Sequence, residues 1–251
     1  MKRKTLTAAD LSLVVVFDNY PHREGLVTSW GFSCLLRGAG KTVLFDTGGD
    51  GAILLNNMRR LGIDPREIDL VVLSHAHGDH TGGLGALLAF NPGVVVSLPA
   101  AFPVSFKEQV RDAGASVVEV NGPQELDEGV LSTGELGSGP IEQSLVLRTD
   151  QGLVLITGCA HPGIVNIAER TNEIHGGDPV RLALGGFHLR DENEEALRRV
   201  LSRLQALGLR RLGPSHCSGD LTREVCRRTL GEGYLELGVG AELSPLGEHL
   251  R

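Results

Sequence analysis

The chain lacks most of the features that mark secreted and membrane proteins. Its 251 residues include only four cysteines, Cys34, Cys159, Cys217 and Cys226, with no CxxC spacing. A disulfide framework is therefore not expected, and a reducing cytoplasmic compartment fits this cysteine usage better. The apolar stretch LVVVF near the N-terminus is far too short to span a membrane, and no small-residue cleavage site follows it. We predict a first strand there, with no export signal and no membrane anchor.

Basic residues are not in excess either. There are 24 Lys and Arg residues against 31 Asp and Glu residues, giving a formal net charge of -7. Because nucleic-acid-binding domains usually carry a basic footprint, this balance makes a nucleic-acid partner unlikely. A hydrophobic content of 41% with 22% charged residues is that of an ordinary soluble globular protein.

Short β-branched runs alternate with amphipathic segments along the chain. Strands are predicted over residues 11–19, 31–38, 41–49, 68–73, 94–100, 116–122, 143–149, 152–161, 181–189 and 210–219. Helices are predicted over residues 52–63, 81–90, 106–114, 165–176, 192–208 and 221–233. Because two similar halves each mix strands and helices, we expect one domain over residues 1–251. Its fold class would be α/β (α+β), an αββα sandwich of four layers with two mixed sheets flanked by helices.

One segment interrupts this alternation of predicted strands and helices. Residues 123–140 read PQELDEGVLSTGELGSGP, which is acidic and rich in Gly and Ser. Two interpretations are open, a flexible linker and a loop that covers an active site. The position of the segment before the strand that ends at His161 motivates the interpretation as a lid.

The strongest motif directly follows the apolar run IDLVVL. Residues 74–80 read SHAHGDH, which places His75, His77, Asp79 and His80 within six positions. Imidazole and carboxylate are ligands that Zn²⁺ and similar cations take. In an extended segment His75, His77 and Asp79 point the same way. A helix-capping loop would explain Asp79 but not three histidines. Four donors exceed what one ion needs from one segment, so the spacing favours two adjacent metals.

Three later histidines share one context, and three others do not. His161, His188 and His216 each follow an apolar run beside a glycine or proline turn, where ligands collect in layered α/β folds. We expect them to join the first cluster. The histidines without this context are predicted to be surface residues: His22, His175 and His249.

These residues carry a family resemblance. The segment from His75 to His80 matches the HxHxDH signature of the metallo-β-lactamase superfamily, and Asp46 in LFDTGG resembles its strand-end Asp that supports the metal loop. TGCAHPGIVNI, GGFHL and HCSG resemble a narrower subgroup, similar to the archaeal dihydropterin–ribofuranosylaminobenzene phosphate synthase. The resemblance implies the sandwich fold and a dinuclear metal site.

The resemblance also implies roles. It assigns His75 and His77 to a first metal, with His161 as the candidate third ligand. It assigns Asp79 and His80 to a second metal, with His216 as the candidate partner.

For two residues, two alternative roles are open. Cys159 stands in TGC, where the superfamily usually has a bridging Asp. It is either a thiolate ligand that favours zinc or a small buried residue. His188 resembles the histidine with which some superfamily phosphodiesterases protonate the leaving group, and direct metal ligation is the alternative.

The function expected from this pattern is a metal-dependent hydrolase. Two Zn²⁺ ions, or Mn²⁺ or Fe instead, would activate water for attack on an ester, phosphoester or related small molecule. Asp79 would orient the water and His188 would protonate the departing group. An anionic or phosphorylated substrate is expected, because two dications outweigh the acidic surface locally. The alternatives are a group-transfer synthase of pterin/ribosyl-phosphate type on the same site and a non-catalytic metal-binding protein.

A few residues near the motifs are expected to be structural. Arg37, Arg190 and Lys107 are predicted to be solvated surface charges, with a contribution to binding an anionic substrate as the alternative. Trp30, the single tryptophan, is predicted to pack in the core, with a role in lining a pocket as the alternative.

Overall fold

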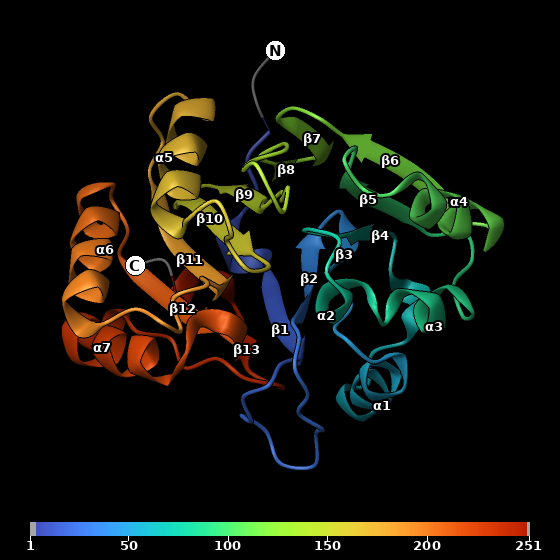
Figure 1. Ribbon diagram of the computed structural model, residues 1–251, viewed down its shortest axis with the longest axis horizontal. Coiled ribbons are helices and arrows are strands. Elements are labelled where there is room, and N and C mark those ends of the chain that lie inside the picture. The colour runs from blue at the N-terminus through green and yellow to red at the C-terminus, as the bar shows by residue number, and fades with distance from the viewer. Residues whose placement is uncertain (1–3, 250–251) are drawn as a thin grey trace.

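Two β-sheets packed face to face form the centre of the computed structural model, which describes residues 4–249 (Figure 1). The larger sheet has seven strands in the order β13-β1-β2-β3-β4-β5-β6, and the smaller has six in the order β12-β11-β10-β9-β8-β7. The larger sheet consists of β1 (Ser12–Phe17), β2 (Ser33–Ala39), β3 (Lys41–Phe45), β4 (Leu70–Val72), β5 (Val95–Pro99), β6 (Ser116–Val120) and β13 (Glu242–Leu243). The smaller consists of β7 (Gln124–Asp127), β8 (Val130–Ser132), β9 (Leu145–Thr149), β10 (Gly152–Thr157), β11 (Val180–Gly186) and β12 (Arg211–Ser215).

Both sheets combine parallel and antiparallel pairs. In the larger sheet β1, β2 and β3 pair antiparallel, whereas β3 through β6 run parallel. In the smaller sheet β7 through β10 pair antiparallel, and β10, β11 and β12 run parallel. The predicted sandwich of two mixed sheets is confirmed.

Helices cover the outer face of each sheet. The larger sheet packs against α1 (Gly51–Leu61), α3 (Leu84–Leu88) and α4 (Val104–Asp112). The smaller sheet packs against α5 (Ile164–Ile174), α6 (Glu194–Ala206) and α7 (Asp220–Leu230), which line the opposite side of the molecule (Figure 1). Every helix among residues 4–249 is too short or too polar to traverse a lipid bilayer.

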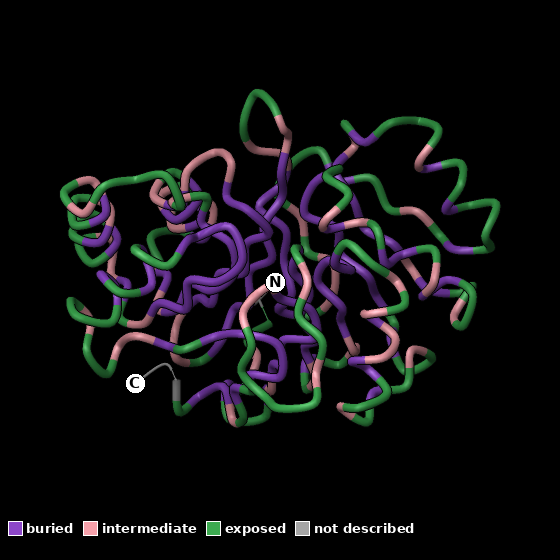
Figure 2. Tube along the Cα trace, turned by 60° about the horizontal axis from the view of Figure 1, so that its bottom comes forward, coloured by how far each residue is buried: buried purple, intermediate pink, exposed green. Residues whose placement is uncertain are grey.

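The alternation of side chains along each strand separates the core into layers. In β1, Leu13 and Val15 belong to the cluster between the two sheets, whereas Val14 and Val16 belong to the cluster under the helices. Successive strand residues point to opposite faces, so an uninterrupted apolar run is what a doubly covered strand requires. Figure 2 shows the consequence: the buried strands occupy the centre, and exposed residues gather on the outer helices and loops.

The local sequence of helix α6 determines where the helix begins and which of its side chains are buried. Asn193 caps its N-terminus by accepting a hydrogen bond from the Ala196 N–H. Leu197, Leu201 and Leu204 then recur at helical spacing and are buried. The helix predicted over residues 192–208 is observed over Glu194–Ala206.

Residues 123–140 are not a linker, as one interpretation held. Their first part forms the hairpin β7–β8, which continues the smaller sheet next to β9. The alternation in QELD and VLS was too short to stand out from its glycine-rich surroundings. The later part, Leu136 to Pro140, lines a cavity of about 400 Å³ together with His161. This part therefore lies beside the candidate site, and its role as a covering loop stays a prediction.

The edge formed by the parallel strand ends positions the chemistry. β3 and β4 end directly before Asp46 and the SHAHGDH segment, and β10, β11 and β12 end before Cys159, His188 and His216. Because parallel strands bring their carboxyl ends to one edge of a sheet, the motifs from both halves can meet at one edge of the sandwich.

The layer between the sheets makes the largest apolar contribution to stability. Leu147 in β9 is fully buried there, whereas Leu221 on α7 is 39% exposed. Leu147→Ala should lower the free energy of unfolding by about 2–5 kcal/mol, because it removes buried methyl groups and leaves a cavity. The same change at Leu221 should cost under about 0.5 kcal/mol. Equal denaturant midpoints for the two variants would contradict this assignment of the core.

Candidate metal centre

Metal-ligating side chains from both sheets converge at this edge. Four groups of three have ligand atoms within 4.8 Å of one another: His75, His77 and His161; Asp79, His80 and His216; His75, His80 and Cys159; and Cys159, His188 and Cys217. All seven residues predicted to bind metal are among them, together with His188. The structure shows that these residues lie close together. That they bind metal remains a prediction.

The first triad consists of His75, His77 and His161. Nε2 of His75 lies 3.0 Å from Nδ1 of His77. The ring centre of His161 lies 4.7 Å from that of His75 and 5.0 Å from that of His77. His75 and His77 belong to the loop after β4, and His161 belongs to the loop after β10, so the triad joins the two sheets.

The second triad consists of Asp79, His80 and His216. Oδ2 of Asp79 lies 3.2 Å from Nε2 of His216 and 3.6 Å from Nε2 of His80. Asp79 and His80 lie in the short helix α2 (Gly78–Thr81), and His216 begins a turn directly after β12. The ring centres of His75 and His80 are 4.3 Å apart, so the two triads lie side by side.

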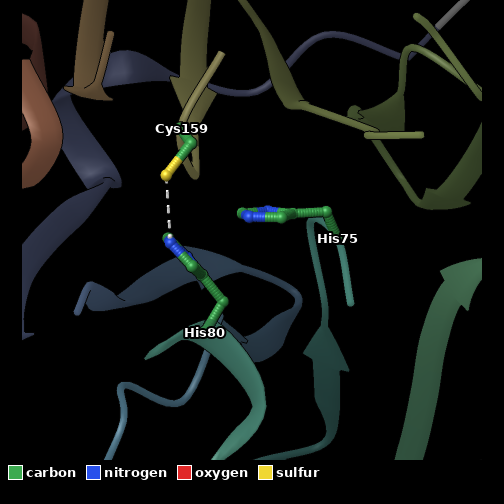
Figure 3. A group of neighbouring side chains, drawn as sticks. All are labelled: His75, His80 and Cys159. Carbon is green, nitrogen blue, oxygen red and sulfur yellow. Dashed lines mark hydrogen bonds between the residues drawn. The ribbon is translucent and has the colours of Figure 1, made fainter. Parts of the chain in front are cut away.

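Cys159 lies between the triads. Its Sγ is 3.2 Å from Nε2 of His80, a contact drawn in Figure 3, and it also groups with His75. The thiol descends from the loop after β10 toward the two imidazoles, which come from the other sheet (Figure 3). Cys159 is only 3% exposed, so it is both small and buried and directed at the candidate ligands.

A buried carboxylate orients one ligand of each triad. Asp46 accepts hydrogen bonds from the backbone N–H of Ser74 at 2.7 Å, the Ser74 hydroxyl at 2.7 Å and Nδ1–H of His80 at 2.7 Å. Ser74 Oγ in turn accepts from Nδ1–H of His75 at 2.9 Å. Fixing the proton on Nδ1 leaves the Nε2 lone pairs of His75 and His80 free to face the centre.

Glu142 performs the same task for the first triad's third histidine. Its buried carboxylate accepts from Nδ1–H of His161 at 3.0 Å and from the backbone N–H groups of Cys159, Ala160 and His161. Burial raises the pKa of Glu142, but the bond from His161 and these N–H groups outweigh it and lower the pKa to about 2. Glu142 was missed by sequence reasoning, because a single Glu in an irregular loop carries no motif.

Asn19 holds the imidazole of His216. Its Oδ1 accepts a hydrogen bond from Nδ1–H of His216 at 3.0 Å. Each of these four histidines therefore has one ring nitrogen fixed by a neighbour and the other directed inward. Such paired orientation is typical of metal-ligating imidazoles.

Backbone strain concentrates at the same edge. The non-glycine residues with positive φ are Asp46 at 54°, Ala160 at 58°, His188 at 51° and His216 at 48°, among the residues described. L-residues seldom adopt this conformation, which costs of order 1–3 kcal/mol each. Every one of the four lies directly in a site loop or beside a candidate ligand. The surrounding hydrogen bonds keep these turns in place and aim the side chains.

The donor set fits divalent cations. Within the described part of the chain, the buried Nε2 of His216 has no hydrogen-bond partner, and it faces the Asp79 carboxylate. Burial and the neighbouring imidazoles lower the pKa of His75 to about 2, so this ring stays neutral and retains its lone pair. Neutral imidazoles with a carboxylate and a thiol are a ligand set for Zn²⁺, Mn²⁺ or Fe.

The other predicted surface groups differ in outcome. His22 is exposed, as expected, and Arg37 is partly exposed and pairs with Glu67. His175 is not a surface residue: it is 5% exposed and lies beside Arg148 under α5. The side chain of His249 lies outside the described residues.

Lys107 and Trp30 also depart from expectation. Lys107 is 7% exposed, and its ammonium donates to the Ala100 carbonyl and to Glu119, so its charge is compensated instead of solvated. Trp30 does not pack in the core, because its side chain is among the exposed large hydrophobic ones at 46%. A large apolar residue is usually buried, whereas this ring is partly exposed and lies beside that of His216.

Comparison with known proteins assigns the chain to a protein family. The model of the metallo-β-lactamase superfamily matches residues 31–216, and the chain belongs to that superfamily. The predicted resemblance is confirmed. Members of this superfamily bind divalent metals, in agreement with the donor groups at the sheet edge.

Individual relatives differ in their reactions. The chain is 30% identical over 247 residues to the 7,8-dihydropterin-6-methyl-4-(beta-D-ribofuranosyl)-aminobenzene-5'-phosphate synthase of Methanocaldococcus jannaschii, covering 81% of this chain and 84% of that protein. A crystal structure of a metal-dependent hydrolase of the β-lactamase superfamily aligns with a TM-score of 0.77 at 25% identity, over 93% of this chain and 98% of the other. A diphosphatase from the PhnP family shares the fold, with a TM-score of 0.63 at 18% identity over 93% and 96% of the two chains.

Glu142 provides a test of the hydrogen-bond network. Its folded pKa of about 2 lies below the ordinary 4.5, so its charge stabilises the fold above about pH 4.5 and loses this effect as the pH falls toward 2. Glu142→Gln should lower the free energy of unfolding by about 3 kcal/mol at pH 7, and the difference from wild type should shrink between about pH 4.5 and 2.

The measurement is chemical unfolding at several pH values, with Glu108→Gln on the exposed face of α4 as the control. The control should match wild type at every pH. A difference for Glu142→Gln that stays constant down to pH 2 would argue against an ionised anchor.

Proposed function

We propose that the protein is a metal-dependent hydrolase of small phosphoester or ester substrates. The proposal rests on the two adjacent triads, whose ligand atoms lie close together. In four of their histidines the outer ring nitrogen is fixed by a neighbour, namely Ser74, Asp46, Glu142 or Asn19. A pair of divalent cations in these triads would supply a nucleophilic water at neutral pH and stabilise charge on the attacked ester. Zn²⁺ is the proposed ion because of the neighbouring Cys159, with Mn²⁺ or Fe as alternatives.

Individual residues of the chain supply the other functions that the proposed reaction needs. The triads hold their donors in place before substrate arrives, which avoids reorganisation during the reaction. Asp79 is partly exposed, and we assign to its carboxylate the orientation of the attacking water. The Asp46 and Glu142 carboxylates stay away from substrate, because they are buried and fully engaged by N–H and O–H donors.

His188 is the proposed proton donor to the leaving group. Its side chain is exposed, and its ring centre lies 4.7 Å from that of His161, at the margin of the first triad. The Cys217 sulfur beside it, as a thiolate, accepts a hydrogen bond from the imidazolium and raises the pKa of His188 above its usual value, although partial burial opposes this. A raised pKa increases the fraction of the imidazole that is protonated and able to act as a general acid.

The free cysteines support a reducing compartment for this activity. Cys159 and Cys217 are buried and unpaired in the structure although their sulfur atoms lie within 4.8 Å of each other. Oxidation would join two groups that the proposed site uses as thiols, so we propose that the protein works in the cytoplasm.

A group-transfer reaction is the second candidate. It is favoured by the 30% identity to a synthase whose name gives a pterin and a ribofuranosyl-aminobenzene phosphate. The two reactions differ in the nucleophile, since a hydrolase needs water alone and a synthase needs an acceptor. Phosphorylated aromatic substrates suit both candidates.

Metal content tests the dinuclear site. Purified wild type should carry two divalent ions per chain by plasma emission and should hydrolyse a bis-aryl phosphodiester without an added acceptor. Asp79→Ala should lower the content to about one ion and the turnover by at least about 100-fold, because the second triad loses its carboxylate.

Asp112→Ala, an exposed position at the end of α4, is the matched control and should change neither quantity. Two retained ions with full activity in Asp79→Ala would overturn the assignment. Two ions with turnover only when an amine acceptor is present would favour the synthase.

His188 gives a test that depends on the leaving group. His188→Gln should slow esters with alkoxide leaving groups by about 100-fold, because these need a proton, and 4-nitrophenyl esters by less than about tenfold. For the alkyl esters, wild-type turnover should fall as the pH rises through the raised pKa of His188. The turnover of His188→Gln should not show this decrease.

His22→Gln, in an exposed loop far along the chain from these motifs, is the control. An equal loss with both leaving groups, together with a lower metal content, would instead identify His188 as a metal ligand.

A further inference from the structure

The only tryptophan of the chain is exposed beside the second triad. Trp30 is 46% exposed, and its ring centre lies 4.7 Å from that of His216 at an interplanar angle of 54°. The contacts of the indole with His216 and Arg190 leave about half of its surface in water, which is a substantial apolar area for a single side chain. Neither the proposed metal ligation nor the proton transfer uses this face.

The backbone around Trp30 is fixed to the metal loop. The adjacent Gly31 has φ of 138°, and a Cβ on it would lie 2.3 Å from the Asp79 carbonyl oxygen and 2.9 Å from the Gly49 nitrogen. Phe32, on the other side of Gly31, is fully buried, and its N–H donates to the same Asp79 carbonyl. Trp30 therefore stands at a set position relative to Asp79 and is not a freely moving loop residue.

A positive charge accompanies the indole. The guanidinium carbon of Arg190 lies 5.6 Å from the centre of the Trp30 ring. Arg190 is exposed, and it follows His188 by two residues in the loop after β11. The same short loop thus carries the proposed proton donor and a cation with several N–H groups that suit a phosphate or carboxylate.

We propose that Trp30 and Arg190 form a substrate subsite for a planar aromatic group that bears a phosphate or similar anion. This inference rests on the proposed function, because it specifies the substrate class of the same site. The aromatic ring stacks on the indole at the margin of the second triad, and Arg190 pairs with an anionic oxygen of the substrate. A flat aliphatic group would gain the apolar contact but not the preference for stacking.

Binding of inert phosphonates tests the subsite without requiring turnover. Phenylphosphonate and cyclohexylphosphonate have the same charge and similar bulk, and their C–P bond is not a hydrolysable ester. The zinc-loaded wild type should bind phenylphosphonate about three- to tenfold more tightly by calorimetry. Its fluorescence should also change more on phenylphosphonate binding, because the single tryptophan is the stacking partner.

Variants separate stacking from charge. Trp30→Leu should abolish the preference for phenylphosphonate, and Trp30→Phe should retain most of it. Arg190→Gln should weaken both phosphonates about equally, by about three- to tenfold, and keep the preference. Zinc content and circular dichroism establish that each variant retains its fold and metal.

The outcomes distinguish this inference from the proposed function. Equal affinities of wild type for the two phosphonates, or a preference that survives Trp30→Leu, would overturn the subsite even if phosphoesters are hydrolysed. A Trp30-dependent preference without hydrolysis of any ester would support the subsite and count against the hydrolase alone.

Discussion

The hydrogen bonds of the Asp46 carboxylate underlie the arrangement of the whole metal centre. Asp46 follows β3 in a strained left-handed conformation and accepts from Ser74, after β4, and from His80, in α2. Through Ser74 it also fixes the proton of His75, so one buried charge orients a ligand in each triad. A buried carboxylate without these three donors would be strongly destabilising, so the strand ends and the helix start must meet in one geometry. The rest of the site is built outward from this contact.

The sandwich supplies the rigidity that such a site needs. The edge loops contain strained residues, a fully buried Glu142 and several buried imidazoles, all of which oppose folding. The apolar layer between the sheets and the two layers under the helices offset this cost. Parallel strands matter here, because they deliver five loops to the same edge of the sandwich. Stability therefore resides in the strands, and chemistry resides in the turns that follow them.

The sequence was sufficient for the parts of the molecule with regular patterns. The strands other than β7, β8 and β13, the helix α6 and the HxHxDH cluster have periodicity or a dense ligand spacing, and the later histidines were found because each ends an apolar run. Glu142 and Asn19 had no such pattern, since a lone polar residue in a loop acquires its partner only through folding. Trp30 was misassigned to the core for a related reason: the general tendency to bury large apolar groups does not tell which one a fold leaves exposed.

The two triads have a mechanical consequence for the two halves of the chain. His75, His77, Asp79 and His80 come from the larger sheet, whereas His161, Cys159 and His216 come from the smaller one. An ion in either triad would thus act as a cross-link between segments about 80 or more residues apart in sequence, in the manner of a removable covalent bridge. A bound ion would therefore couple metal supply to the cohesion of the two halves.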